Sequence, residues 1–196
     1  MPRRPIASRS WYLVLAAFVG LSLWPLFARC PPMQDYPQHL VLTQVLANID
    51  DPASDYRRYF ETHLGVVYST FYVVTLGLAK VMSIQTAGRV TLGLYPLLVL
   101  AMVWRIQRRA AGGAEPWGAV LFFPLSFNQQ YFLGNVNYLL ALPLVILALV
   151  DFEEFLEGTP RRSVAIRQAV WPFLLAATHP LALMVFIALA LVTSAW

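Results

Sequence analysis

A series of apolar stretches separated by short polar segments constrains the fold of this chain most. The stretches cover roughly residues 11–28, 66–83, 88–104, 117–134, 138–150, 168–178 and 181–196. A helix needs about 20 apolar residues, at roughly 1.5 Å rise each, to cross a bilayer. Only 12% of the residues are charged, whereas about 25% are charged in soluble domains. The sequence therefore predicts an all-α integral membrane protein, folded as a polytopic transmembrane helical bundle.

The two ends of the chain indicate how this bundle begins and stops. Arg3, Arg4 and Arg9 precede the stretch 11–28, which is longer than a signal-peptide core and has no small-residue cleavage site after it. We therefore expect a retained first helix. The last apolar stretch reaches Trp196 with no polar segment behind it. We interpret residues 1–196 as a single transmembrane domain, the N-terminal part of a longer protein.

Basic residues indicate the side of the membrane on which each loop lies. Two groups of arginines separate apolar stretches: Arg105, Arg108 and Arg109, and then Arg161, Arg162 and Arg167. Cytoplasmic loops carry the excess of Lys and Arg. If residues 66–83 cross the membrane, 9 of the 14 basic residues lie outside, whereas 9 lie inside if this stretch follows the interface or dips in and returns. The second topology is preferred, with a cytoplasmic N-terminus.

This topology makes the first outer loop, about residues 29–88, long enough to contain interfacial helices. After Pro37, apolar residues at positions 42, 45, 46 and 49 recur at helical spacing and predict a short amphipathic helix. The stretch from Val66 to Ser83 is more uniformly apolar. We expect it to lie near the membrane surface.

The candidate reactive residues all fall on the outer side in this topology. His39 and His63 lie in the first outer loop, and His179 lies at a break between two apolar stretches. Asn135 and Asn137 lie in the turn LGNVN. No second reactive residue stands at helical spacing from His63, so the other four residues are the stronger candidates for a site.

Asp35 and His39 form the first candidate pair. They are four residues apart, so their side chains share one face of a helix that begins near Asp35. The carboxylate could act as a general base or help to hold a divalent cation, with His39 orienting it or contacting a phosphate. Alternatively, Asp35 caps the helix N-terminus and His39 is an interfacial histidine.

Amide side chains form the second candidate group. Asn135 and Asn137 lie between two apolar stretches, where polar groups should face a cavity, the bundle interior or the outer interface. They could bind sugar hydroxyls or phosphate oxygens, as could His179. The alternatives are a solvated turn for the asparagines and a helix cap for His179.

Together these features resemble the N-terminal half of the GT-C superfamily of membrane glycosyltransferases. A first apolar helix is followed by PPMQDYPQHL (31–40), by loop helices and by Gly88-Arg89 before the next apolar stretch. The segment DYPQHL is closest to a poorly characterised bacterial group with DYPxH. The resemblance covers most of the chain. It implies a GT-C-like fold in the bacterial inner membrane and transfer of a hexosyl or pentosyl group from a polyprenyl-phosphate-linked sugar.

The resemblance also implies roles for particular residues. The acid of the first outer loop, which maps onto Asp35, is the usual catalytic base or metal-site residue, so a divalent metal is a possible cofactor. Lys80 or Arg89 could contact the lipid phosphate, and either could instead anchor the chain at the interface. The pattern departs from the superfamily where Tyr36 stands in place of a second acid, and where a later outer turn offers only Asn135 and Asn137.

A non-enzymatic membrane protein is the main alternative, either a lipid or small-molecule transporter or an assembly subunit. An ion-coupled transporter carries acidic or basic side chains inside the membrane. The apolar segments in question here are 88–104, 117–127, 138–150 and 181–196. Apart from Arg89 near its start, they carry no acidic, basic or histidine side chain, which disfavours ion coupling. Signatures of nucleotide, zinc and serine-hydrolase sites are absent. The net charge of +4 reflects membrane orientation, so we expect no nucleic-acid partner.

Overall fold

The computed structural model describes residues 9–28, 31–62, 67–110, 120–122, 124, 126–158 and 162–194. The regular structure of these residues is entirely helical, which confirms the all-α prediction. The helices are α1 (Arg9–Phe27), α2 (Tyr36–Ala47), α3 (Tyr56–Tyr59), α4 (Thr70–Ala79), α5 (Ile84–Ala110), α7 (Gln129–Leu133), α8 (Val136–Glu157), α9 (Arg162–Thr178) and α10 (Pro180–Ser194). His63 lies outside the described residues, as do Arg3, Arg4 and Arg161.

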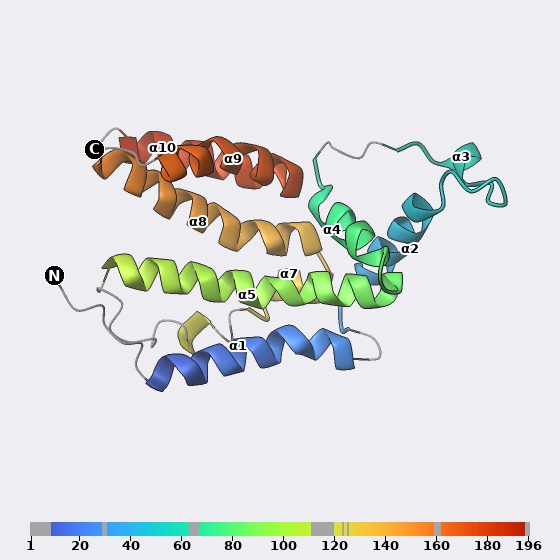
Figure 1. Cartoon of the computed structure of the whole chain (residues 1–196), viewed down its shortest axis with the longest axis horizontal. Coiled ribbons are helices and arrows are strands. Elements are labelled where there is room, and N and C mark those ends of the chain that lie inside the picture. Colours follow the sequence, from blue (N-terminus) through green and yellow to red (C-terminus); the bar gives the residue numbers. More distant parts are fainter. Residues whose placement is uncertain are drawn as a thin grey trace.

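The long helices lie side by side, and the short helices α2, α3 and α4 gather at one end of them (Figure 1). α1 packs on α5, α5 on α8, and α8 on both α9 and α10. α2 and α4 pack against the beginning of α5. We call this the loop end, defined by α2, α4 and the first turns of α5 and α8. The opposite end, where Arg105, Arg109 and Arg167 lie, is called the arginine end.

α4 does not run along the bundle. Its 10 residues span about 15 Å, half the thickness of the roughly 30 Å hydrocarbon core of a bilayer. The chain turns at Lys80, and the Ser83 hydroxyl then accepts a hydrogen bond from the Thr86 amide (3.2 Å) at the start of α5. As a result α1 ends and α5 begins at the same end of the molecule (Figure 1). The side of a membrane that each end of the bundle faces stays a prediction.

Two helices of the described chain are long and apolar enough to cross a membrane. They cover residues 10–27 in α1 and 84–109 in α5. Buried helices of soluble proteins and signal sequences reach similar length and hydropathy. The structure therefore shows the helical architecture, and the polytopic membrane arrangement stays a prediction.

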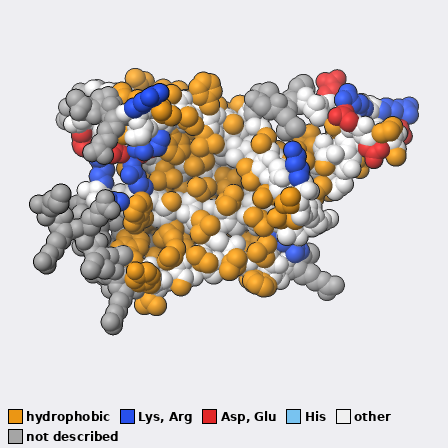
Figure 2. Space-filling model, in the orientation of Figure 1, with side chains coloured by type: hydrophobic (Ala, Val, Ile, Leu, Met, Phe, Trp, Pro, Cys, Tyr) orange, Lys and Arg blue, Asp and Glu red, His pale blue; other side chains and the backbone are white. Residues whose placement is uncertain are grey.

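The arginine end is held together by ion pairs between three helices. Asp151 of α8 is buried and accepts hydrogen bonds from Arg105 of α5, from Nε of Arg167 (2.9 Å) and from the indole N–H of Trp171 (3.1 Å) on α9. Arg109 donates to Glu153 at 3.1 Å. Figure 2 shows charged side chains towards the ends of the bundle and hydrophobic side chains over its middle.

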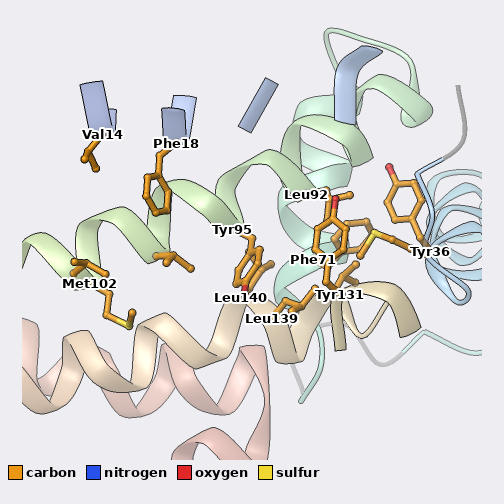
Figure 3. Close-up of a cluster of buried hydrophobic side chains, with 14 residues drawn as sticks. Val14, Phe18, Tyr36, Phe71, Leu92, Tyr95, Met102, Tyr131, Leu139 and Leu140 are labelled. Atoms are coloured by element: carbon orange, nitrogen blue, oxygen red, sulfur yellow. The ribbon is translucent and has the colours of Figure 1, made fainter. Parts of the chain in front are cut away.

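The main hydrophobic core joins the long helices to the loop end. Val14 and Phe18 of α1 point towards α5, and Met102 of α5 points from the other side of that helix towards α8 (Figure 3). Towards the loop end the same core contains Phe71 of α4 and Tyr131 of α7. α2 and α4 are therefore anchored to the bundle by aromatic packing, and this packing positions the polar residues that they carry.

Candidate functional site

The two polar segments singled out in the sequence contact each other directly. The amide of Gln34 donates to the Phe132 carbonyl (2.9 Å), and the amide of Asp35 donates to the Leu133 carbonyl (3.0 Å). A helix leaves its last carbonyls without partners inside the helix. The segment before α2 therefore completes the C-terminal end of α7, and the structure brings DYPQHL against the turn that follows α7.

Gly134 permits this close contact. Its φ of +83° lies in the left-handed region, where a side chain is strained. A Cβ at this position would lie 2.8 Å from the amide nitrogens of both Asp35 and Tyr36. A glycine is thus required at this turn both by its backbone conformation and by the approach of the neighbouring chain.

Asp35 stands at the first turn of α2 with a free carboxylate. It occupies the N-cap position but forms no side-chain capping hydrogen bond. Its carbonyl accepts from the His39 amide (3.2 Å), which places His39 one helical turn further on. Within the described chain no hydrogen bond to the Asp35 carboxylate is formed. The capping alternative is therefore not what this side chain does, and its charge is available to groups nearby.

His39 is half-buried between α2 and α4. Its Nδ1 lies 2.7 Å from the Tyr72 hydroxyl, and its ring packs 5.7 Å from the ring of Phe71. Burial lowers the pKa of His39, and this effect is only partly opposed by the charge of Asp35 and by the backbone of Gly134. His39 is therefore a neutral imidazole at pH 7. It shares a hydrogen bond with the Tyr72 hydroxyl and lies close enough to Asp35 to interact with its charge.

A cavity of about 530 Å³ opens at the loop end beside His39. It is lined by His39, Tyr68, Tyr72, Gln130, Asn135, Val136, Asn137, Tyr138, His179 and Leu181. Four predicted site residues, from three distant parts of the sequence, thus meet in one space. Asp35 is not part of the lining, and it adjoins the cavity through His39.

Asn137 supports the cavity wall. Its side-chain oxygen accepts from the Phe71 amide (3.0 Å), and its side-chain nitrogen donates to the Tyr68 carbonyl (2.9 Å). The side chain is buried. Both ends of the amide are thus engaged with the backbone around α4, while the Asn135 amide donates to Gln130. Asn137 positions the segment 68–71 against α8.

His179 lies on the far wall of the same cavity. Its ring meets the ring of Tyr68 at 4.7 Å and the ring of Tyr138 at 5.4 Å, in both cases nearly edge to face. Burial lowers the pKa of His179. Its Nδ1 is buried and finds no hydrogen-bond partner within the described chain. This nitrogen therefore caps no helix in the described chain, and the rings of Tyr68 and Tyr138 cover the imidazole.

Lys80 and Arg89 lie near the loop end but outside the cavity lining. Lys80 is exposed directly after α4. Arg89 lies in the second turn of α5, close enough to Tyr36 for its charge to oppose the effect of burial, which raises the pKa of Tyr36 to about 12. Neither residue lines the cavity, so their contact with a lipid phosphate stays a prediction.

The tyrosines of the cavity were not predicted as site residues. Tyr68 and Tyr72 lie four residues apart around the start of α4, and Tyr138 lies in the first turn of α8. Two features of the sequence indicate these tyrosines: Tyr68 and Tyr72 are four residues apart, and all three tyrosines lie beside polar turns. Only the packing of α4 across α2 and α8 reveals that their rings face the two histidines.

An apolar groove of about 350 Å³ continues from this cavity along the bundle. Its walls come from α5, α8, α10 and the segment 122–128, and it shares Tyr138 and Leu181 with the cavity. Val99 and Met102 of α5 and Leu189 of α10 line it further along the bundle. The polar cavity at the loop end and the apolar groove along the bundle are thus neighbours with two lining residues in common.

The donor set does not build a metal centre by itself. Asp35 and His39 supply two possible ligands, and the described residues contain no cluster of three or more His, Cys, Asp or Glu side chains. A divalent cation at this pair would take its remaining ligands from water and from a substrate phosphate.

Comparisons with known proteins do not assign the chain to a family. No protein-family model, no curated protein sequence and no solved structure matches it.

Proposed function

We propose that this chain is a membrane glycosyltransferase that moves a sugar from a polyprenyl-phosphate donor to an acceptor on the extracytoplasmic face. One observation carries the proposal. His39, Asn135, Asn137 and His179 line a single cavity at the loop end with Asp35 beside it, while the arginine network lies at the opposite end. This separation agrees with a site that opens outwards and with arginines that face the cytoplasm.

Exposed apolar side chains support the membrane setting. Leu13 of α1 is 74% exposed, and Leu191 of α10 is 66% exposed. Large exposed apolar surfaces are costly in water and mark contact with lipid or protein. We place the outward faces of α1 and α10 in lipid, which makes the chain an integral protein of the bacterial inner membrane.

The cavity and the groove together match a donor that is polar at one end and apolar at the other. The sugar would occupy the cavity, and the polyprenyl chain would follow the groove along α5, α8 and α10. The phosphate would lie where the cavity and the groove share Tyr138 and Leu181, and Lys80 and Arg89, which line neither space, are proposed as its cationic partners. A lipid-linked donor entering sideways from the bilayer fits this arrangement.

The transfer step requires a proton acceptor near the acceptor hydroxyl. We assign this role to Asp35, whose carboxylate is not occupied by capping. The hydroxyl oxygen attacks the anomeric carbon, the proton passes to Asp35, and the bond to the phosphate oxygen breaks with its electron pair. Polyprenyl phosphate leaves, and the configuration at the anomeric carbon inverts. Neutral His39 would orient the carboxylate and contact the sugar.

A passive lipid transporter is the second candidate, because the apolar groove would also accommodate a lipid tail. The described part of α5 that lines the groove, around Val99 and Met102, carries no charge. The two functions differ in chemistry. A transporter returns the donor unchanged, whereas a transferase splits it into a glycoside and polyprenyl phosphate.

Asp35→Asn tests the transferase assignment. The amide keeps the shape of the side chain but is a far weaker base, so we expect donor turnover to fall at least about 100-fold, the lower range for loss of general-base catalysis. Release of polyprenyl phosphate from a radiolabelled polyprenyl-phosphate sugar, in membranes containing the full protein, measures it.

Asp55→Asn is the matched control. Asp55 also precedes a helix without capping it, but its helix, α3, supplies no residue to the cavity lining, whereas α2 supplies His39. This variant should retain turnover. Equal turnover of wild type and Asp35→Asn would remove Asp35 from the mechanism, and movement of intact donor across vesicles without cleavage would favour the transporter.

A further inference from the structure

We propose that Tyr68 and Tyr138 form an aromatic clamp beside His179 that binds the apolar C–H face of a pyranose ring, with Tyr68 as the residue that selects for it. The inference rests on the proposed function in one respect: it names the part of the cavity that holds the transferred sugar. It requires only that the cavity binds a neutral ring, and its test is therefore separate from turnover.

The backbone of Tyr68 is held in a strained conformation. Its φ of +62° makes it the only non-glycine residue with positive φ in the described chain. Such a conformation costs about 1–3 kcal/mol and persists where the surroundings impose it. Here the Tyr68 carbonyl accepts from Asn137 (2.9 Å), and the next amide, of Ser69, donates to the Ala177 carbonyl (2.8 Å).

Core packing does not explain this strained tyrosine. Tyr68 is 44% exposed, whereas Tyr36 and Tyr131 are 2% and 3% exposed within the core. The Tyr68 ring lies against His179 at 4.7 Å with an interplanar angle of 82°. Asn137 and the α9 backbone thus keep a partly exposed ring at the cavity wall, at a cost that folding alone does not require.

The clamp has two rings and an unused polar atom between them. Tyr138 meets the same imidazole at 5.4 Å and 78° from the side of α8. Nδ1 of His179 is buried and has no partner within the described chain. This buried nitrogen is not open to the cavity, so a ligand that covers the rings would find its polar partners in Gln130 and Asn135 on the lining.

The lining selects a neutral ring over an anion. Among the described residues, the lining contains no Asp, Glu, Lys or Arg side chain, and burial lowers the pKa of both His39 and His179, so both are neutral at pH 7. Aromatic faces carry partial negative charge and attract the polarised C–H groups of a sugar ring. Polar groups around an aromatic surface then bind the hydroxyls, as in other small-molecule sites.

Saturation-transfer difference NMR tests the clamp with defined probes. The full chain in lipid nanodiscs is mixed with methyl β-D-glucopyranoside, methyl β-D-galactopyranoside or methyl α-D-mannopyranoside, and with acyclic sorbitol for comparison. We expect saturation to reach at least one pyranoside, most strongly at C–H protons on one ring face, and to be weak for sorbitol. Wild-type protein that saturates none of the three pyranosides overturns the proposal.

Substitutions of Tyr68 separate the ring from the fold. Tyr68→Phe keeps the ring and should keep binding, whereas Tyr68→Leu should weaken it roughly 3- to 10-fold, the range for one aromatic contact. Tyr68→Gly removes the ring and also the strain, so it should bind as weakly as Tyr68→Leu while its melting temperature is equal to or above that of wild type. Tyr59→Leu, on exposed α3, is the matched control.

The outcomes distinguish the clamp from the transferase assignment. Unchanged pyranoside binding in both Tyr68→Leu and Tyr68→Gly overturns the clamp even if the donor is turned over normally. Ring-dependent binding in a protein that never cleaves the donor leaves the clamp in place and overturns the proposed function. In the active protein, Tyr68→Leu should raise KM for the donor more than it lowers kcat.

Discussion

Gly134 determines how the DYPQHL segment and the turn after α7 fit together. Its left-handed backbone and its missing Cβ allow the amides of Asp35 and Tyr36 to approach the chain closely. The same contact sets the position of Asp35 beside the cavity. A change at Gly134 should therefore affect both stability and the site.

Gly134→Ala should destabilise the protein by about 1–3 kcal/mol through backbone strain. The new Cβ would also lie 2.8 Å from two backbone nitrogens, which must move away. We expect a lower melting temperature in nanodiscs, and donor turnover reduced further than the change in folded fraction explains.

Gly77→Ala serves as its control, because a Cβ there meets nothing within 4 Å and the residue lies inside α4. It should be neutral or stabilising by up to about 1 kcal/mol. Equal melting temperatures for the two alanine variants would show that the turn tolerates a side chain.

Among single residues, the sequence predicted one neighbour relation and missed the longer-range contacts. Asp35 and His39 were expected to be neighbours from their spacing, and the backbone bond between them agrees with that expectation. The two backbone bonds of Asn137 and its burial were not predictable, because they depend on Tyr68 and Phe71, more than 60 residues away. Its role as a sugar ligand stays a prediction.

At the scale of helices, α1 and α5 approach each other where both carry a small residue, Ser22 on α1 and Gly93 on α5. A Cβ on Gly93 of α5 would collide with the backbone carbonyl of Ser22 on α1. The Ser22 hydroxyl is turned back to the Phe18 carbonyl (2.8 Å) within its own helix. Small residues at such crossings let two helices pack closely in a membrane.

Gly93→Ala should push α1 away from α5, because the obstacle is backbone and cannot rotate aside. We expect a loss of about 1–3 kcal/mol, typical of overpacking, read as a lower unfolding temperature. Gly20→Ala on α1 is its matched control, since nothing lies within 4 Å of a Cβ there. A Gly93→Ala protein as stable as the control would contradict the close crossing.

The arginine end joins α5, α8 and α9 through one buried acid. Asp151→Asn keeps the side-chain shape but leaves Arg105 and Arg167 without their shared carboxylate. Asp151 is buried, but the side chains of Arg105 and Arg167 are 29% and 43% exposed, and both also pair with Glu154. We therefore expect a loss of about 1–3 kcal/mol, the cost of leaving a buried polar group without its partner, read as a lower melting temperature.

Glu157→Gln is the control for that substitution. Glu157 pairs with Arg109 at 2.6 Å, but its side chain is 71% exposed. An exposed pair contributes about 0–1 kcal/mol. Similar melting temperatures for Asp151→Asn and Glu157→Gln would show that the network is not needed to hold the three helices together.

At the scale of the whole molecule, the two chemistries lie at opposite ends. The cavity is built by α2, α4, α8 and the α9–α10 junction at the loop end, and the ion-pair network is built at the other end. α4 makes this possible because it is too short to carry the chain along the bundle. The proposed site requires that the loop end face the exterior.

Cysteine labelling checks this orientation. In a Cys30→Ser background, Ala53→Cys on the exposed loop before α3 should react with a membrane-impermeant maleimide in intact cells. Gly158→Cys, exposed after α8, should react only once the membrane is permeabilised. The reverse pattern would place the cavity in the cytoplasm and remove the outer-face transfer reaction.

The sequence by itself determined the helical class, the approximate helices and the clustering of polar residues in two segments. Those properties depend on local composition and on spacing along one helix, such as the Asp35–His39 interval. The stretch 66–83 shows the limit, because α4 occupies only Thr70–Ala79 and composition does not state where an apolar helix ends.

Only the tertiary structure decided that the two polar segments touch, that Asn137 holds Tyr68 in a left-handed conformation, and that two tyrosines flank His179. Each of these contacts joins residues that are far apart in the chain. Their geometry is set by how α2, α4 and α8 pack around the aromatic core, and that packing is a property of the whole fold.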